Sequence, residues 1–261
     1  MSNRTENSFV KKGSFASNGE EINYLYFKPN KTGTYPAIVF HPGNRLFPED
    51  YEWLHKKLVQ KGYAVFALYQ RGYGSGKNGI NDRAGLIQQN DFAKAVQVLQ
   101  QMEDIQNDRI GLIGHSNGAG MALRIAAINQ EIKCVVSMSM ISDWGEFVKR
   151  LEHHLPDYYK TVCEHFKGSP NENLQAYEER SCIQFANQIH IPVLFVSGND
   201  DVITPTYQTT WMHEALLESG NKSSKLYIVN EVGHFYEKYS FSGYKTEEVG
   251  NTIADWIAHV L

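Results

Sequence analysis

The sequence of 261 residues is poor in cysteine, and its three cysteines show no pairing pattern. Cys134, Cys163 and Cys182 are odd in number, lie far apart and form no C-x-x-C motif, so we expect free thiols rather than disulfides or a zinc site. His153 and His154 are adjacent, and on a helix they would diverge by about 100 degrees, which prevents chelation of one ion. We therefore expect a protein that uses no metal.

The sequence also has neither a large excess of charge of one sign nor a long hydrophobic run. The formal net charge is −4, which gives no reason to expect a nucleic acid partner. Residues 1–7 lack the apolar core of a signal peptide, and no later stretch approaches the roughly 20 apolar residues of a membrane span. We expect a soluble, cytoplasmic protein that binds neither nucleic acid nor membranes, and the sequence leaves its oligomeric state open.

A dinucleotide site is missing as well. The segment from Arg71 to Gly76 reads R-G-Y-G-S-G, but no helix opens directly after it and no acidic residue sits where a ribose partner is needed. We interpret this segment as a flexible connector and expect no cofactor.

Strands and helices alternate along most of the chain. Residues 8–28 alternate apolar and polar side chains around a turn at 17–20, which predicts a β-hairpin. Continuous apolar runs of strand length follow at 35–40, 63–68, 109–113, 134–138, 193–197 and 225–229. They alternate with helical patterns, which predict helices over 90–102 and 206–218 among others. Because such runs are typical of strands buried on both faces, we predict an α/β protein with a mostly parallel, twisted sheet of about eight strands covered by helices on both sides.

Residues 141–190 interrupt this alternation with polar and aromatic sequence. Fifty residues are too many for a bare connection, so we predict a small helical insertion over one edge of the sheet. Substrate would enter beneath it.

A strand-turn-helix pattern surrounds Ser116. Gly114-His115-Ser116-Asn117-Gly118 reads G-x-S-x-G between the apolar run that ends at Gly114 and a helix-forming stretch. The glycines two before and two after the serine remove Cβ atoms that would collide in so tight a turn, and the hydroxyl is left at its apex. We predict that Ser116 is a nucleophile.

A serine hydroxyl needs a base and an acid that orients the base, and in this kind of fold both follow later strands in the order acid, then histidine. Asp200 and Asp201 follow the strand at 193–197, and His234 follows the strand at 225–229. Spacing alone leaves either aspartate open. Thr204 is expected to cap the next helix, with Pro205 as its first residue.

The reaction also needs N–H donors for the developing oxyanion. The backbone N–H of Asn117 is the expected first donor. The second should come from the loop after the strand at 35–40, which reads His41-Pro42-Gly43-Asn44. Pro42 has no N–H, so Gly43 or Asn44 must donate, and we favour Gly43.

Several stretches are similar to the catalytic domain of prolyl oligopeptidase-type serine peptidases, including acylaminoacyl and dipeptidyl peptidases, within the α/β-hydrolase superfamily. The resemblance covers about residues 20–260 and rests on G-Y-A-V at 62–65, D-R-I-G-L at 108–112 and the long run at 171–181. The family's G-x-x-D-x-x-V/T-P pattern falls on Gly198, Asp201, Thr204 and Pro205, which selects Asp201 as the acid. The chain departs from the family at Gly118-Ala119-Gly120, where two successive glycines are usual, and at His41-Pro42-Gly43-Asn44, where a G-G-P order is common.

The resemblance implies one α/β-hydrolase domain over 1–261, with 141–190 as a cap-like insertion and without the amino-terminal β-propeller of such peptidases. It implies a serine hydrolase, a carboxylesterase or small peptidase, that takes a small ester or a short peptide through Ser116, Asp201 and His234. Two alternatives are a non-catalytic binding protein on the same fold and a cofactor-free lyase or haloperoxidase.

Overall fold

The computed structural model describes residues 3–5, 8–71, 85–236 and 244–261. In these ranges a nine-stranded sheet runs in the order β1-β2-β3-β5-β4-β6-β7-β8-β9. The strands are β1 (Asn3–Thr5), β2 (Ser8–Ser17), β3 (Glu20–Pro29), β4 (Tyr35–His41), β5 (Ala64–Leu68), β6 (Ile105–His115), β7 (Ile132–Met138), β8 (Val193–Gly198) and β9 (Lys225–Val229). The predicted connector after Arg71 lies mostly outside the described residues.

The sheet is mostly parallel, as the sequence predicts. β5, β4, β6, β7, β8 and β9 pair in parallel, whereas β1, β2 and β3 form an antiparallel edge. Besides the three-residue β1, these are the eight predicted strands, and the hairpin at β2 and β3 is confirmed. Because parallel strands end at one edge, the loops after β4, β6, β8 and β9 gather there.

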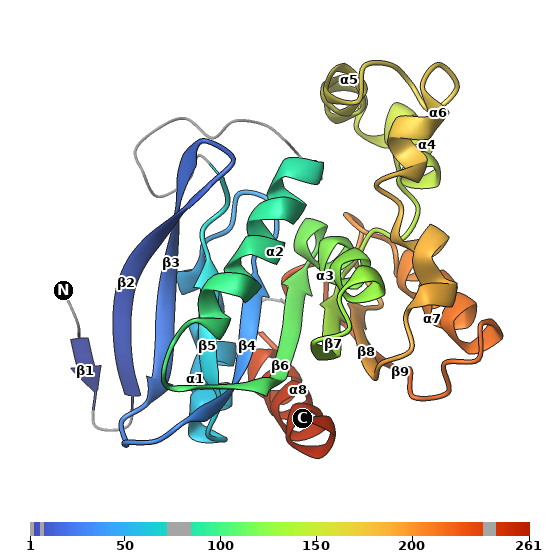
Figure 1. Ribbon diagram of the computed structural model, residues 1–261. Coiled ribbons are helices and arrows are strands. Elements are labelled where there is room, and N and C mark those ends of the chain that lie inside the picture. Colours follow the sequence, from blue (N-terminus) through green and yellow to red (C-terminus); the bar gives the residue numbers. More distant parts are fainter. Residues whose placement is uncertain (1–2, 6–7, 72–84, 237–243) are drawn as a thin grey trace.

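Helices cover both faces of the sheet (Figure 1). On one face lie α2 (Leu86–Gln100), α3 (Asn117–Ile128) and α7 (Thr206–Glu218), and on the other lie α1 (Glu52–Gln60) and α8 (Thr246–Val260). β5 and β8 are buried along their whole length between the two helical layers. This double coverage explains why β5 is continuously apolar and why β8 begins with a run of four apolar residues rather than an alternating pattern.

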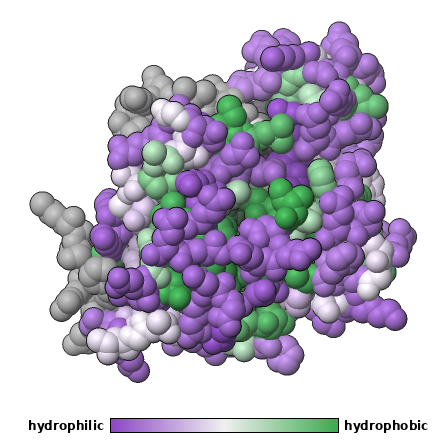
Figure 2. Space-filling model, in the orientation of Figure 1, coloured by the Kyte–Doolittle hydropathy of each residue, from purple (hydrophilic) through white to green (hydrophobic). Residues whose placement is uncertain are grey.

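The surface over α2 and α3 is mainly hydrophilic, with hydrophobic side chains in separate groups (Figure 2). Cys134 and Cys182 are buried and Cys163 is partly buried, and all three are free thiols, as predicted. Burial raises the pKa of both Cys134 and Cys182 to about 12, so both stay protonated and inert near neutral pH. In the described ranges no helix is long and apolar enough to cross a bilayer.

The segment 141–190 contains α4 (Trp144–His154), α5 (Pro156–His165), α6 (Leu174–Glu178) and the short 3₁₀ helix η2 (Cys182–Gln188). α4, α5 and α6 extend beyond the body of the sheet (Figure 1). They enclose a small hydrophobic cluster separate from the two cores on the sheet, built around Trp144, Phe147, Phe166 and Tyr177. The aromatic residues of this segment therefore serve mainly to hold the helices together.

Two local predictions were wrong. Pro205, not Thr204, occupies the N-cap of α7, and Thr204 turns its side chain toward the loop before the helix. The helix predicted over 90–102 begins four residues earlier, at Leu86. Leu86 and Ile87 are exposed, so the amphipathic pattern on which the prediction relied does not extend to them.

Candidate active site

Ser116 stands at the sharp turn between β6 and α3. Its backbone has φ 53° and ψ −116°, a conformation that L-residues rarely adopt. The glycines around it are required, because a Cβ on Gly114 would lie 2.2 Å from the carbonyl oxygen of Gly118, and a Cβ on Gly118 would lie 2.6 Å from that of His41. The turn is fastened to β7, since the Ser116 N–H donates to the Met138 carbonyl at 2.7 Å.

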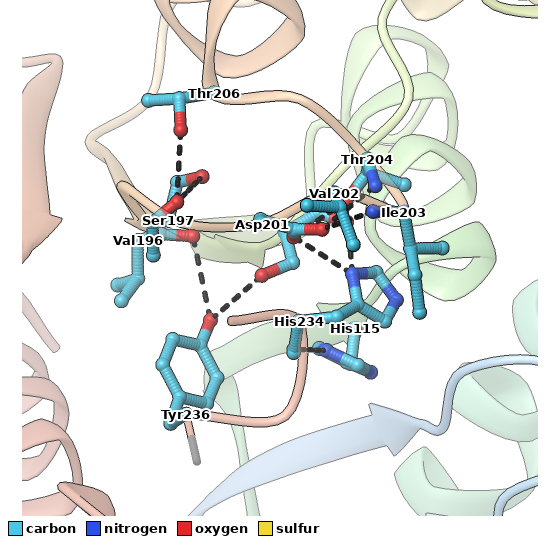
Figure 3. Close-up of polar contacts among 12 residues, drawn as sticks. His115, Val196, Ser197, Asp201, Val202, Ile203, Thr204, Thr206, His234 and Tyr236 are labelled. Atoms are coloured by element: carbon cyan, nitrogen blue, oxygen red, sulfur yellow. Dashed lines mark hydrogen bonds and ion pairs between the residues drawn. The ribbon is translucent and has the colours of Figure 1, made fainter. Parts of the chain in front are cut away.

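His234 and Asp201 meet at the same edge of the sheet. His234 Nδ1 lies 2.7 Å from Asp201 Oδ2, and both side chains are buried. Figure 3 shows Asp201, Thr204 and His234 pointing toward one another. Asp201 Oδ1 accepts hydrogen bonds from the backbone N–H groups of Ile203 and Thr204, at 2.9 and 2.8 Å. The loop after β8 thus holds both carboxylate oxygens.

These contacts keep Asp201 ionised. Burial raises the pKa of this carboxyl. The hydrogen bond and charge of His234 and the hydrogen bonds from Thr204 lower the pKa, and together they outweigh burial, so the pKa lies below its usual value. An ionised carboxylate only accepts, so the Nδ1–H of His234 donates to it. In the tautomer with the proton on Nδ1, the proton acceptor of the ring is Nε2.

The other acids near this pair are turned to solvent. Asp200 is exposed and its side chain has no hydrogen bond in the described part of the chain, although its N–H donates to the Val232 carbonyl. Glu231 is also exposed. The structure therefore brings Asp201, and neither of these, to His234.

A second buried chain of polar groups was not predicted. Tyr51 lies in the 3₁₀ turn η1 (Pro48–Tyr51), and its hydroxyl is 2.7 Å from His115 Nδ1. His115 Nε2 lies 2.9 Å from the backbone carbonyl oxygen of His234. Gly43 donates its N–H to the Tyr51 hydroxyl at 3.1 Å. In the sequence, Tyr51 looks like an ordinary aromatic residue of the core. Only the structure shows that its buried hydroxyl links Gly43 to His115.

The polarity of this chain follows from its ends. Burial, together with the charge of His234, lowers the pKa of His115 to about 3, so the ring is neutral near pH 7. A carbonyl can only accept, which makes Nε2 of His115 the donor and Nδ1 the acceptor of the Tyr51 hydroxyl proton. The chain ties the loop after β4 to the loop that carries His234.

The oxyanion prediction at Gly43 needs correction. The Gly43 N–H already donates to Tyr51. Gly43 instead permits close packing, because a Cβ on it would lie 2.7 Å from His115 Nδ1 and 3.2 Å from the Cβ of Ser116. Within the described ranges, the N–H groups of Asn44 and Asn117 make no hydrogen bond. Asn44 is followed by residues that line the same cavity as Ser116, and Asn117 follows Ser116 directly, so these two N–H groups are the candidate donors to an oxyanion.

Ser116 and His234 line one cavity of about 480 Å³. No hydrogen bond joins the Ser116 hydroxyl to His234 among the described residues. The two residues are related by the cavity that both of them line. Its walls come from the loop after β4, from α5 and from the loops after β8 and β9. The lining residues are Gly43, Asn44, Arg45, Leu46, Ser116, Asp157, Tyr158, Thr161, Ile203, His234 and Phe235.

Comparisons with known proteins agree with this architecture. An uncharacterised peptidase of Bacillus subtilis, YtmA, is 24% identical over 234 residues, which cover 85% of this chain and 84% of the relative. The acylaminoacyl peptidase of Pyrococcus horikoshii superposes with a TM-score of 0.78 at 19% identity, over 98% of this chain but only 42% of that protein. A cold-adapted esterase from an Arctic intertidal metagenomic library superposes with a TM-score of 0.69 at 18% identity, over 100% of this chain and 97% of the esterase.

These structural likenesses establish the α/β-hydrolase fold, with its mostly parallel sheet between two helical layers. The profile of the prolyl oligopeptidase family, peptidase S9, matches residues 50–261, which include Ser116, Asp201 and His234. With most of its length matched, this chain is a serine-type hydrolase that belongs to the prolyl oligopeptidase family.

Proposed function

We propose that this protein hydrolyses an ester or amide bond of a small substrate through a covalent acyl-enzyme on Ser116. The observation that carries the proposal is the buried pair of His234 and Asp201, 2.7 Å apart, at the cavity that Ser116 also lines. His234 would act as general base and then as general acid, and Asp201 would orient its ring. A carboxylesterase or a small peptidase fits this arrangement.

The steps follow from the order of the groups. Ser116 Oγ attacks the carbonyl carbon while Nε2 of His234 takes the hydroxyl proton. The tetrahedral oxyanion accepts hydrogen bonds from the N–H groups of Asn117 and Asn44, each of which can contribute about 3 kcal/mol. When the intermediate collapses, the leaving alcohol or amine takes the proton from His234. Water then repeats the sequence and releases the acid product.

We also propose that residues 1–261 work as one domain in which the insertion 141–190 closes the active site from above. Asp157, Tyr158 and Thr161 of α5 line the same cavity as Ser116, which supports this arrangement. One wall of the cavity is α5, which comes from the insertion and not from the helices that cover the sheet. The insertion can therefore shape substrate choice without disturbing the catalytic residues.

The test is reaction with a fluorophosphonate probe and with 4-nitrophenyl butyrate. We expect the wild-type protein to be labelled on the peptide that contains Ser116, and the Ser116→Ala variant to lose both labelling and turnover. Ser223→Ala, at an exposed serine remote from the cavity, is the matched control. Unchanged labelling of Ser116→Ala would overturn the proposal, and an inert wild type would favour a binding protein on this fold.

A second comparison separates the two activities. Aminoacyl 4-nitroanilides have a poorer leaving group than 4-nitrophenyl esters of the same acyl group. Cleavage of both substrates, lost together in Ser116→Ala, would identify a peptidase. Cleavage of the esters alone would identify a carboxylesterase.

A further inference from the structure

The catalytic cavity contains a cation that the proposed chemistry does not use. Arg45 lines the cavity two residues after Gly43, on the loop that packs against Ser116. Arg45 is an exposed residue and makes no ion pair or hydrogen bond with any described residue. Among the described lining residues it is the only lysine or arginine. A guanidinium carries a positive charge and offers several N–H donors.

The backbone of this loop holds Arg45 in an unusual conformation. Leu46 donates its N–H to the Gly43 carbonyl at 3.1 Å, which closes a four-residue turn, and Arg45 has φ 62° at its third position. That combination matches a type II turn, where glycine or asparagine is favoured at the third position because a side chain is disfavoured at positive φ. An arginine here works against the turn preference.

The opposite wall carries one negative charge, which does not neutralise Arg45. Asp157 lies in the first turn of α5 and also lines the cavity, but it forms no ion pair with Arg45. A carboxylate in the first helical turn is favoured by the helix dipole, so Asp157 has a structural reason to be there. Arg45 has none. An anionic ligand in this cavity would be attracted to the loop and repelled from α5.

We propose that Arg45 binds a carboxylate of the substrate, so that the enzyme prefers small esters or amides carrying a free carboxylate near the scissile bond. Monoesters of dicarboxylic acids and short peptides with a free carboxyl terminus have this chemistry. A guanidinium offers two parallel N–H donors to a carboxylate, and the Asp157 carboxylate fixes the orientation by excluding the anion from the other wall. This inference rests on the proposed role of Ser116.

The experiment compares pairs of substrates in which one member carries an additional carboxylate. On the acyl side, the 4-nitrophenyl monoester of glutaric acid is compared with 4-nitrophenyl pentanoate. On the leaving-group side, 3-carboxy-4-nitrophenyl butyrate is compared with 4-nitrophenyl butyrate. We expect the wild type to show a higher kcat/KM for the anionic member of at least one pair, and the preference to shrink as ionic strength rises.

Arg45→Gln should reduce the ratio of anionic to neutral kcat/KM about tenfold, mainly through KM. Arg45→Lys should retain part of the ratio, because it keeps the charge but loses the paired donors. Lys133→Gln removes the same charge from an exposed position at the start of β7, far from the carboxyl edge, and should leave the ratio unchanged. Asp157→Asn should raise the ratio.

Three results would overturn the inference: no preference for an anionic substrate in either pair, a preference insensitive to salt, or the same ratio in Arg45→Gln as in the wild type. Since every value is a ratio measured on an active enzyme, these results leave the proposal for Ser116 standing. Failure of that proposal would appear differently, as an absence of turnover on neutral and anionic esters alike.

Discussion

The active site has two halves that differ in how their polar groups are used. In the half made by Asp201, Thr204 and His234, both carboxylate oxygens and Nδ1 of the ring have partners within the protein. In the half made by the loop Gly43–Leu46, the Asn44 N–H and the Arg45 side chain have none among the described residues. In the proposed mechanism the first half transfers the proton, and the second provides the donors for a ligand.

This difference shows where preorganisation is needed. The ring of His234 must present Nε2 in one orientation, so its other contacts are fixed in advance. The donors for an oxyanion and for a substrate charge must be free before the substrate arrives. Tyr51 and His115 connect the halves, since they join the Gly43 N–H to the His234 carbonyl through three hydrogen bonds.

The largest effect is expected in the half that transfers the proton. Asp201→Asn should lower kcat by about 10⁴-fold, because an amide that donates to Nδ1 leaves His234 with its proton on Nε2, where the ring cannot accept from Ser116. Single-turnover hydrolysis of 4-nitrophenyl butyrate measures this. Asp200→Asn removes the same charge from the exposed neighbour and should keep activity near the wild-type level. Equal losses in both variants would contradict the assignment of the acid.

A smaller effect is expected in the half that provides the donors. Asn44→Pro should lower kcat by roughly 10² to 10³, because it removes one donor to the oxyanion. Proline is favoured at the second position of a type II turn, so the loop should tolerate it. Asn44→Ala keeps the N–H and is the control. If alanine proves as damaging as proline, the donor is the side chain or the loop itself, and the comparison between the two halves fails.

The connection between the halves should matter less than either. Tyr51→Phe leaves the buried Gly43 N–H without its acceptor and His115 without its donor, and we expect kcat to fall about tenfold with little change in KM. Tyr63→Phe alters another buried tyrosine, whose hydroxyl reaches the Ile257 carbonyl away from the site. If the two variants lose similar thermal stability but Tyr51→Phe loses more kcat, Tyr51 has a positioning role. Equal losses of kcat would argue for a general packing effect.

The smallest change concerns acid stability at this connection. In the unfolded chain a histidine binds a proton below about pH 6.5, whereas burial holds the pKa of folded His115 to about 3. Between these values the unfolded state binds more protons, so the free energy of unfolding decreases as the pH falls. His115→Gln should reduce that slope by up to about 1.4 kcal/mol per pH unit.

The slope is measured by urea unfolding at several pH values between 4.5 and 6.5. His153→Gln, at an exposed histidine, is the control and should leave it unchanged. The His115→Gln variant should keep part of the slope, because burial also lowers the pKa of His41 to about 4 and that of His55 to about 3. An identical slope in His115→Gln and the wild type would mean that His115 is already protonated in the folded state.

Much of the fold could be predicted because each parallel strand carries its own signal. β8 is buried throughout because helices cover both of its faces, and the four consecutive apolar residues at 193–196 signal this in the sequence. α7 was predicted with its observed bounds, Thr206–Glu218. The beginning of α2 was missed because Leu86 and Ile87 project into solvent and break the periodic pattern.

The positions of Ser116 and His234 at strand ends follow from the sequence, since the residues that make the turn and the strands are local. The choice of Asp201 over Asp200 relied on family resemblance, because adjacent residues in a loop have no periodicity that fixes which one turns inward. In the structure the loop is fixed by the Thr204 hydroxyl, 2.9 Å from the Ser139 carbonyl, a contact across 65 residues.

The sequence by itself determined the sheet, the turn at Ser116 and the order of the acid and the base. These depend on the hydrophobic pattern of single strands and on the steric needs of glycine turns, which act over a few residues. Only the tertiary structure decided that the Gly43 N–H is occupied by Tyr51 and that Arg45, which lines the cavity, has no partner among the described residues. Both depend on where side chains from distant segments meet, and hydrogen bonding at that point is set by packing rather than by local sequence.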